Sequence, residues 1–384
     1  QREAQMLREA MADAGARQGA EARIEPWDWR YWAEKVRVAR FAVDDAEVKP
    51  YFQLDRVAQA AFECAGRLFG LTFTHHPEFP VYHPDVKAYE VKDASGAVVG
   101  VFLQDNFARA SKRSGAWMSS LRWQNRNAPS SPRDPDRVGT ELPIILNNNN
   151  FAKGAPGAPT LLGLDDVRTL FHEFGHGLHH MLTQVNERDV SGISGVEWDA
   201  VELPSQFMEN FCWEWSVLRH MTSHVQTGDP LPRALYDKML AAKNFQSGLQ
   251  TLRQVEFALF DMRLHHEPEH ATAIMSLLDE VRREVSVLPA PAFNRMPHSF
   301  SHVFAGGYSA GYYSYKWAEV LSADAYAAFE ETAHPDGTAS VETGRRYRQE
   351  ILEVGGSRPA LESFKAFRGR EPNIDALLRH QGMA

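Results

Sequence analysis

The stretch from residue 163 to residue 182 constrains this chain most, because it combines helical periodicity with a metal-binding spacing. It contains His172-Glu173-Phe174-Gly175-His176, with two histidines four residues apart. On a helix, such residues project from one side and can bind the same metal ion. Imidazole nitrogens suit Zn²⁺, and a catalytic zinc site has three protein ligands and a water molecule. Glu173 could accept a proton from that water. We therefore predict a site for one zinc ion with His172 and His176 as ligands.

The other residues of this stretch support the helix. At about 100° per residue, His172 and His176 lie within about 40° of each other, opposite the apolar side chains. Asp165 or Asp166 is expected to cap the helix. His179 and His180 could line the site or could simply be exposed, and the alternative for the whole stretch is a helix with histidines on its solvent side. The predicted buried face consists of Val167, Leu170, Phe174, Leu178, Met181 and Leu182.

The spacing of residues leaves the third metal ligand open. A histidine six residues after His176 would indicate another zinc-site pattern, but Leu182 occupies that position. Glu202 begins an apolar, helix-like run, and Gln206 and Glu209 follow it on the same face. Spacing alone does not choose among the downstream acids, which are Glu197, Asp199, Glu202 and Glu209.

Composition excludes several classes of protein. The 384 residues allow two or three lobes, and their 43% hydrophobic content is typical of a globular chain. A formal net charge of −9 argues against a nucleic-acid binder. No apolar run approaches the roughly 20 residues of a membrane helix. The segment 1–23 is charged and does not resemble a signal peptide, and Cys64 and Cys212 are expected to be buried free thiols. A cytoplasmic location is therefore expected.

The pattern along the chain predicts an α+β protein that is mostly helical. We expect a helical segment over 1–85, a small β-sheet region over 86–160 and a helical zinc-binding region over 161–384, with 86–384 forming one catalytic domain. Strands are predicted at 87–92, 97–103 and 142–146, and Arg126–Gly139 is predicted to be a surface loop. Helices are predicted over 54–69 and around the apolar positions Leu249, Leu252, Val255, Leu259 and Met262.

The stretch His172-Glu-Phe-Gly-His-Gly-Leu-His179, followed by Asp199-Ala-Val-Glu-Leu-Pro-Ser-Gln206, resembles the thimet oligopeptidase/oligopeptidase A family of zinc metallopeptidases. The sequence from Trp198 to Phe211 is most similar to the bacterial oligopeptidase A branch. The resemblance implies a zincin-like catalytic domain, the C-terminal catalytic portion of such proteins. It also implies that Glu202 is the third zinc ligand and that Glu173 is the general base.

A second segment, His302-Val-Phe-Ala-Gly-Gly-Tyr308-Ser-Ala-Gly-Tyr-Tyr-Ser-Tyr315, resembles the glycine-rich loop of that family. From chemistry alone it could be a mobile loop or a packed aromatic cluster, and a phenol can donate a hydrogen bond to an oxyanion. The resemblance implies that Tyr308 and Tyr315 contact the substrate carbonyl with assistance from His302. The candidates for substrate binding are Tyr312, Gly306, Gly307 and His179.

The expected function is hydrolysis of internal bonds in short, unstructured peptides through a metal-activated water. One alternative is a peptidyl-dipeptidase that releases C-terminal dipeptides. Another is an inactive peptide-binding fragment, because members of this family are usually longer, with an N-terminal helical half that walls a channel. That lobe could lie in the same chain or in a separate one. Residues Leu142–Asn150 are expected to form an edge strand that pairs with a peptide.

Overall fold

The computed structural model describes residues 1–15, 23–131, 134–288 and 290–383. Internal contacts divide the chain into two compact units. The first unit comprises Gln1–Asp44, Arg233–Trp317 and Leu377–Ala384. The second comprises Asp45–Pro232 and Ala318–Ala376. Each unit is assembled from separated segments, whereas the boundaries expected from the sequence follow the chain continuously.

Helices build the first unit. Two of them, α9 and α10, pack around a core that contains Phe260, Leu278 and Val281, and the α1 and α2 helices enclose a second core around Leu7 and Trp32. The helices and turns are α1 (Arg2–Asp13), α2 (Trp29–Phe41), α8 (Arg233–Ala242), α9 (Ser247–His266), η5 (Pro268–Thr272), α10 (Ile274–Val285), η6 (Met296–Ser299), α11 (Ser301–Phe304) and the beginning of α12 (Ser314–Glu331).

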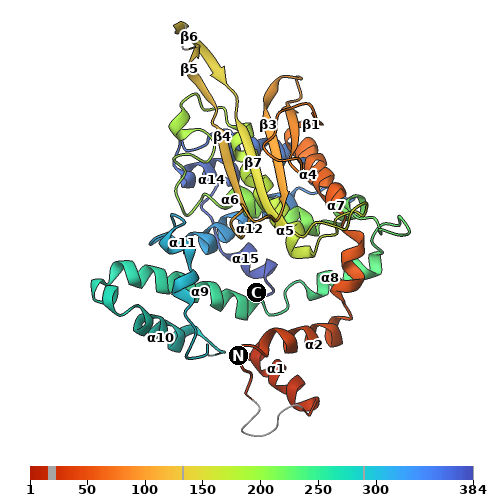
Figure 1. The fold of residues 1–384 in the computed structure, drawn as a ribbon, viewed down its shortest axis with the longest axis vertical. Helices are drawn as coiled ribbons and strands as arrows, with labels where there is room; N and C mark the ends of the chain where they lie inside the picture. The colour runs from red at the N-terminus through yellow and green to blue at the C-terminus, as the bar shows by residue number, and fades with distance from the viewer. Residues whose placement is uncertain (16–22, 132–133, 289, 384) are drawn as a thin grey trace. The chain divides into compact units, whose positions relative to one another are not determined.

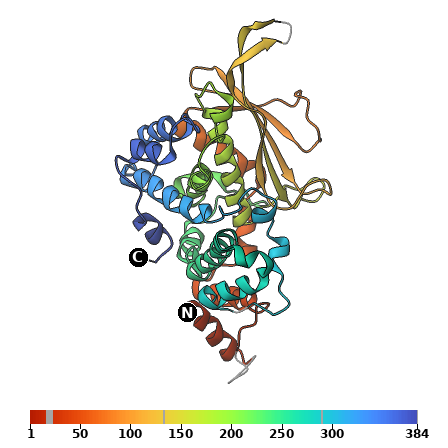
Figure 2. The ribbon, with the colours of Figure 1, turned by 90° about the vertical axis from the view of Figure 1, so that its left-hand side faces the viewer.

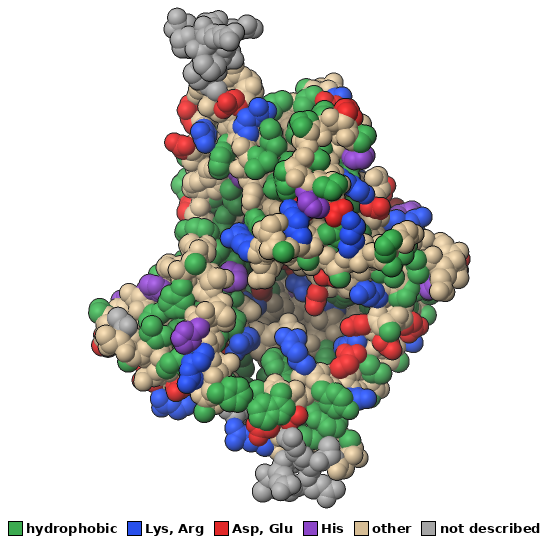
Figure 3. Space-filling view, in the orientation of Figure 1, with side chains coloured by type: hydrophobic (Ala, Val, Ile, Leu, Met, Phe, Trp, Pro, Cys, Tyr) green, Lys and Arg blue, Asp and Glu red, His purple; other side chains and the backbone are tan. Residues whose placement is uncertain are grey.

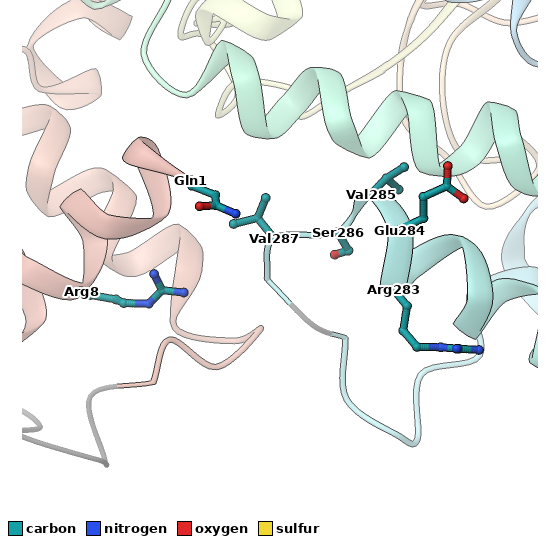
Figure 4. Close-up of a pocket in the computed structure, with 7 residues that line it drawn as sticks. All are labelled: Gln1, Arg8, Arg283, Glu284, Val285, Ser286 and Val287. Carbon is teal, nitrogen blue, oxygen red and sulfur yellow. The ribbon is translucent and has the colours of Figure 1, made fainter.

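A polar pocket also lies in the first unit (Figure 4). It is lined by Gln1, by Arg8 of α1 and by residues 283–287 at the end of α10. It contains none of the predicted site residues.

A mixed five-stranded sheet forms one layer of the second unit, with the order β1-β2-β3-β7-β4 (Figure 1). The β3 and β7 strands are parallel, and the other neighbours are antiparallel. A separate antiparallel hairpin joins β5 to β6. The strands are β1 (Thr72–His75), β2 (Lys87–Lys92), β3 (Val98–Phe107), β4 (Trp117–Arg122), β5 (Asn125–Ser131), β6 (Asp134–Glu141) and β7 (Ile144–Phe151).

The structure confirms a small sheet but corrects two predictions about it. Leu142–Asn150 was expected to form an edge strand, and this is wrong because β7 lies between β3 and β4. The free edge on that side belongs to β4. The segment Arg126–Gly139 is not a loop, because β5 and β6 pair across it; residues 132–133 lie outside the described residues. Its polar composition did not indicate the two strands of this hairpin.

Helices lie against one face of the sheet, as Figure 2 shows, and α5 packs on β3, β4 and β7. Phe62, Phe73, Phe102 and Phe174 join α4, β1, β3 and α5 through ring centroids 4.3–6.2 Å apart. The helices and turns of this unit are α3 (Asp45–Val48), η2 (Lys49–Tyr51), α4 (Leu54–Phe69), α5 (Leu164–Leu182), η3 (Arg188–Val190), α6 (Leu203–Glu209), η4 (Asn210–Trp213), α7 (Trp215–Met221), most of α12, α13 (Val341–Tyr347), the π-helical turn η7 (Arg348–Leu352), α14 (Ala360–Arg368) and the first residues of α15 (Asp375–His380).

The two helices predicted from periodicity are present, but α9 does not bury the face that its apolar positions predict. The α4 helix spans 54–69 and ends at Gly70, which adopts the left-handed conformation with φ +72°. The α9 helix spans 247–266, yet its buried residues are Leu249, Glu256, Phe260 and Asp261. Two of these four are acids, so the apolar stripe read from the sequence does not describe how α9 packs. Cys64 and Cys212 are buried free thiols, as predicted.

The described surface is mixed in charge. Figure 3 shows basic and acidic side chains interspersed over the face it presents. None of the helices in the described ranges is long and apolar enough to cross a membrane.

Candidate metal centre

The α5 helix supplies the predicted metal-binding histidines. Its predicted apolar side chains are all buried, which confirms the face derived from periodicity. The cap differs from the prediction. The helix begins at Leu164 after Gly163, and Asp166 lies inside the first turn, where its Oδ2 accepts the Gly163 N–H at 3.0 Å. A carboxylate within the first turn still stabilises the helix N-terminus.

Four polar residues in the C-terminal half of α5 are buried as well. Glu173, His176, His179 and His180 are between 1% and 8% exposed. The alternative in which His179 and His180 are simply exposed is therefore wrong. Burial lowers the pKa of His179 to about 3 and that of His180 to about 4, and the His176 ring contributes to both shifts. Both rings are thus neutral at pH 7, and neither His179 ring nitrogen has a hydrogen-bond partner among the described residues.

Three donor atoms converge beside α5. Oε2 of Glu202 lies 3.2 Å from Nε2 of His172 and 3.1 Å from Nε2 of His176. His172, His176 and Glu202 each offer a ligand atom within 4.8 Å of the others. Two tetrahedral ligands at about 2.1 Å from zinc would lie about 3.4 Å apart, so these residues fit one zinc ion.

The position of Glu202 depends on a close contact between α5 and α6. Glu202 immediately precedes α6, and a Cβ atom on Gly175 would lie only 2.4 Å from the Pro204 carbonyl oxygen. Glycine between the two histidines therefore lets the helices approach. On its other side α6 is held by Phe207, whose ring stacks on Tyr347 with centroids 4.1 Å apart. The Ser205 hydroxyl donates to Oε2 of Glu202 at 2.8 Å, which orients the carboxylate.

A second carboxylate, that of Glu209, contacts the Nδ1 side of the His172 ring. Oε1 of Glu209 lies 2.8 Å from Nδ1 of His172, and Arg168 donates to Oε2 of Glu209 at 2.7 Å. With Nδ1–H bonded to Glu209, Nε2 is the nitrogen that faces Glu202. Nδ1 of His176, in contrast, has no partner within the described chain. The sequence placed Glu209 on the same face as Glu202 but did not assign it this role.

The electrostatics of the site favour a cation between these carboxylates. Burial lowers the pKa of His172, but Glu202 and Glu209 outweigh burial and hold it well above its usual value. Burial likewise raises the pKa of Glu202, and His176 and His172 outweigh it to bring the pKa well below the usual value. Both shifts have the sign expected of carboxylates that stabilise a neighbouring positive charge, which a divalent ion would supply.

Glu173 stands apart from this hydrogen-bonded group. It is 5% exposed, and its Oε2 atom has no hydrogen-bond partner among the residues that the structure describes. Burial raises the pKa of its carboxyl, although the rings of His172 and His176 oppose the shift. A buried carboxylate with a free oxygen and a raised pKa can accept a proton.

The remaining downstream acids lie elsewhere. The Glu197 carboxylate accepts the Ala360 N–H at 3.1 Å and 3.2 Å, so it caps α14. Asp199 is not among the grouped ligand atoms that could hold a metal in the described chain. Geometry therefore selects Glu202 from the four acids that spacing left open.

The second predicted segment, residues 302–315, lies in the first unit, and its aromatic residues pack together there. The rings of Tyr308 and Tyr315 stack with centroids 4.8 Å apart, and His302 lies 6.0 Å and 5.9 Å from them. Tyr312 is 8% exposed in the core, and its hydroxyl group lies 3.0 Å from Oε1 of Gln254. Tyr312 therefore packs in an aromatic cluster, which was the alternative to a role in substrate binding. Its role in substrate binding stays a prediction. Gly306 and Gly307 are exposed.

Comparison with known proteins identifies the family. Residues 1–383 match peptidase family M3. The chain belongs to this family. It is 46% identical over 379 residues to Oligopeptidase A of Salmonella typhimurium, covering 98% of this chain and 54% of that protein. It is 47% identical over 362 residues to Oligopeptidase A of Escherichia coli, covering 94% and 52%.

A third relative in the comparison is Dipeptidyl carboxypeptidase of Salmonella typhimurium, at 37% identity over 365 residues, which covers 94% of this chain and 51% of that protein. The chain therefore spans about half the length of these relatives.

The contact of α5 with α6 yields a test of how this M3 chain holds metal. Gly175→Ala should weaken zinc binding by at least tenfold, because the added Cβ would push Pro204, and Glu202 with it, away from the histidines. Gly177→Ala is the matched control, since its Cβ would meet Phe102, Asn147 and Ile145 at ordinary distances of 3.4–3.5 Å. Chelator competition measures both affinities. Equal affinities in the two variants would contradict this account.

The support behind His172 yields a second test. Glu209→Gln should lower zinc affinity by about 10- to 100-fold, the range typical of carboxylates that orient a metal-bound histidine. The amide cannot provide the negative charge that Arg168 and His172 share. Glu197→Gln, which alters an acid away from the ligands, is the control. Titration with a fluorescent zinc indicator compares them, and unchanged affinity in Glu209→Gln would show that Glu209 does not support the site.

Proposed function

We propose that this chain carries the catalytic centre of a zinc metallo-oligopeptidase that hydrolyses internal peptide bonds of short, unstructured peptides. The convergence of His172, His176 and Glu202, with Glu173 buried beside them, is the observation that carries the proposal. The oligopeptidase relatives support the substrate class. The zincin-like character of the domain is part of the same proposal.

Within this site each residue has a separate proposed role. His172, His176 and Glu202 would hold zinc, which lowers the pKa of a water molecule and polarises the scissile carbonyl when it is bound. Glu173 accepts a proton from the attacking water and later delivers it to the leaving amine. Its unpartnered Oε2 supports this role, because an oxygen committed to another hydrogen bond would be a poorer acceptor.

The proposal also includes the predicted roles of the glycine-rich segment. We propose that the Tyr308 and Tyr315 hydroxyl groups donate hydrogen bonds to the developing oxyanion and that His302 assists them. Their close packing supports a shared role, since the centroids of the three rings lie 4.8–6.0 Å apart. His179, Gly306 and Gly307 stay candidates for substrate binding.

An edge strand is available for the peptide, although it is not the one expected. Among the described strands of the sheet, β4 pairs only with β7, and α5 packs against both. An extended peptide could add to the free edge of β4 by main-chain hydrogen bonds, which select for unstructured substrates. This assigns substrate pairing to Trp117–Arg122 instead of Leu142–Asn150.

The role of Glu173 can be tested directly. Glu173→Gln should retain zinc and the fold but lower kcat by about two to four decades, because the amide cannot accept the water proton. Glu202→Gln should lose zinc affinity as well as turnover. Hydrolysis of an internally quenched peptide, measured beside zinc content, separates the two. Full activity in Glu173→Gln would refute the mechanism, and zinc binding without hydrolysis by the unmodified chain would favour the inactive peptide-binding fragment.

The mode of cleavage is tested by its products. We expect internal cleavage of a ten-residue peptide whether its C-terminus is free or amidated, as detected by mass spectrometry. Release of dipeptides that stops on amidation would instead favour the peptidyl-dipeptidase, an alternative supported by the 37% identity to a dipeptidyl carboxypeptidase. A requirement for a further lobe, in the same or a separate chain, and a cytoplasmic location both stay predictions.

A further inference from the structure

The α9 helix carries a buried acid that the proposed mechanism does not use. Asp261 is 0% exposed, on the helix face that packs into the core of the first unit. Its Oδ1 accepts the Ala310 N–H at 2.9 Å, and its Oδ2 accepts the Tyr312 N–H at 2.9 Å. His265 Nδ1 lies 3.0 Å from the same Oδ1. A single carboxylate thus binds two backbone groups about fifty residues further along the chain.

These two groups belong to the segment that carries Tyr308. Residues 304–307 of this segment are exposed, whereas Gly311 and Tyr312 are buried. The backbone also needs support here, because Ala310 adopts a left-handed conformation with φ +55°, which residues other than glycine rarely adopt. Asp261 accepts the N–H of that same residue. The carboxylate therefore stabilises the conformation at the point where the exposed part of the segment enters the core.

Neighbouring contacts connect the anchored residue Tyr312 and its neighbours to the catalytic candidates Tyr308 and Tyr315. Tyr312 packs against Phe257 of α9 with centroids 5.7 Å apart and against Tyr315 with centroids 5.2 Å apart. The Gly311 N–H donates to the Tyr308 carbonyl at 2.9 Å. A shift of Ala310 and Tyr312 would therefore move both Tyr308 and Tyr315.

We infer that Asp261 is a positioning residue that holds the Tyr308–Tyr315 segment in the conformation needed for catalysis. This inference rests on the proposed function of Tyr308 and Tyr315. An aspartate is suited to the task because each of its two oxygens can accept one N–H, whereas asparagine offers one acceptor and a donor. In Asp261→Asn, an amide N–H would face a backbone N–H, and one of the two hydrogen bonds would be lost.

The test compares Asp261→Asn with a matched buried acid on the same helix. Glu256 is 3% exposed and pairs with Arg282 at 3.0 Å, so Glu256→Gln disturbs α9 without touching the segment. Hydrogen exchange by mass spectrometry should show faster exchange over residues 304–313 in Asp261→Asn alone. Its kcat should fall about 10- to 100-fold with little change in KM, and zinc affinity should stay unchanged, because only the geometry of the tyrosines is altered.

A double variant distinguishes positioning from a general loss of stability. Tyr308→Phe in the Asp261→Asn background should lower kcat by less than about twofold further, because both changes remove one interaction. Additive losses, or a kcat within about twofold of the unmodified chain despite faster exchange, would overturn the inference. If Asp261→Asn does not fold, Asp261→Ser, which keeps an acceptor oxygen without an amide group, is measured in the same way.

The exchange measurement is independent of peptide hydrolysis. An unmodified chain that hydrolyses no peptide would refute the proposed function, and unchanged exchange in Asp261→Asn would refute the anchoring of the segment. Faster exchange with an intact kcat would leave the proposed function standing and remove Asp261 from the positioning role.

Discussion

The close contact between α5 and α6 at Gly175 is the constraint on which the metal centre depends. Without a side chain at this position, the backbone around Pro204 and Ser205 can lie against α5, and Glu202 reaches both imidazoles. Aromatic packing holds each helix from its far side, through Phe174 for α5 and Phe207 for α6. The ligands are thus placed by rigid elements, which makes their geometry insensitive to loop motion.

Burial gives the centre its electrostatic character. Carboxylates removed from water interact more strongly with neighbouring charge, and the Arg168–Glu209–His172 series extends from the helix surface to the His172 ring, whose other nitrogen faces Glu202. Glu173, in the same buried surroundings, has one oxygen, Oε2, without a hydrogen-bond partner among the described residues. The two acids therefore have different surroundings, because Glu209 is hydrogen-bonded to charged neighbours whereas Glu173 keeps an oxygen that no described residue contacts, which suits the different roles proposed for them.

Several features were predictable because they depend on local sequence. The α4 helix, the buried face of α5 and the strands β2 and β3 follow from periodicity and turn residues, which act over a few positions. The exposed-or-buried state of His179 was not predictable, because periodicity separates polar from apolar faces without showing what packs against either. The α9 helix shows the same limit, since Asp261 is buried by a partner about fifty residues away.

The sequence by itself determined that two histidines share a helix face, that a glutamate stands between them, and that acids follow on a second helix-like run. Resemblance to known peptidases added the choice of Glu202. Only the tertiary structure decided that Glu202 meets both rings, that Glu209 supports His172, and that β4 instead of β7 forms the sheet edge. These outcomes depend on the approach of elements distant in sequence, which periodicity does not encode because it registers only neighbours along the chain.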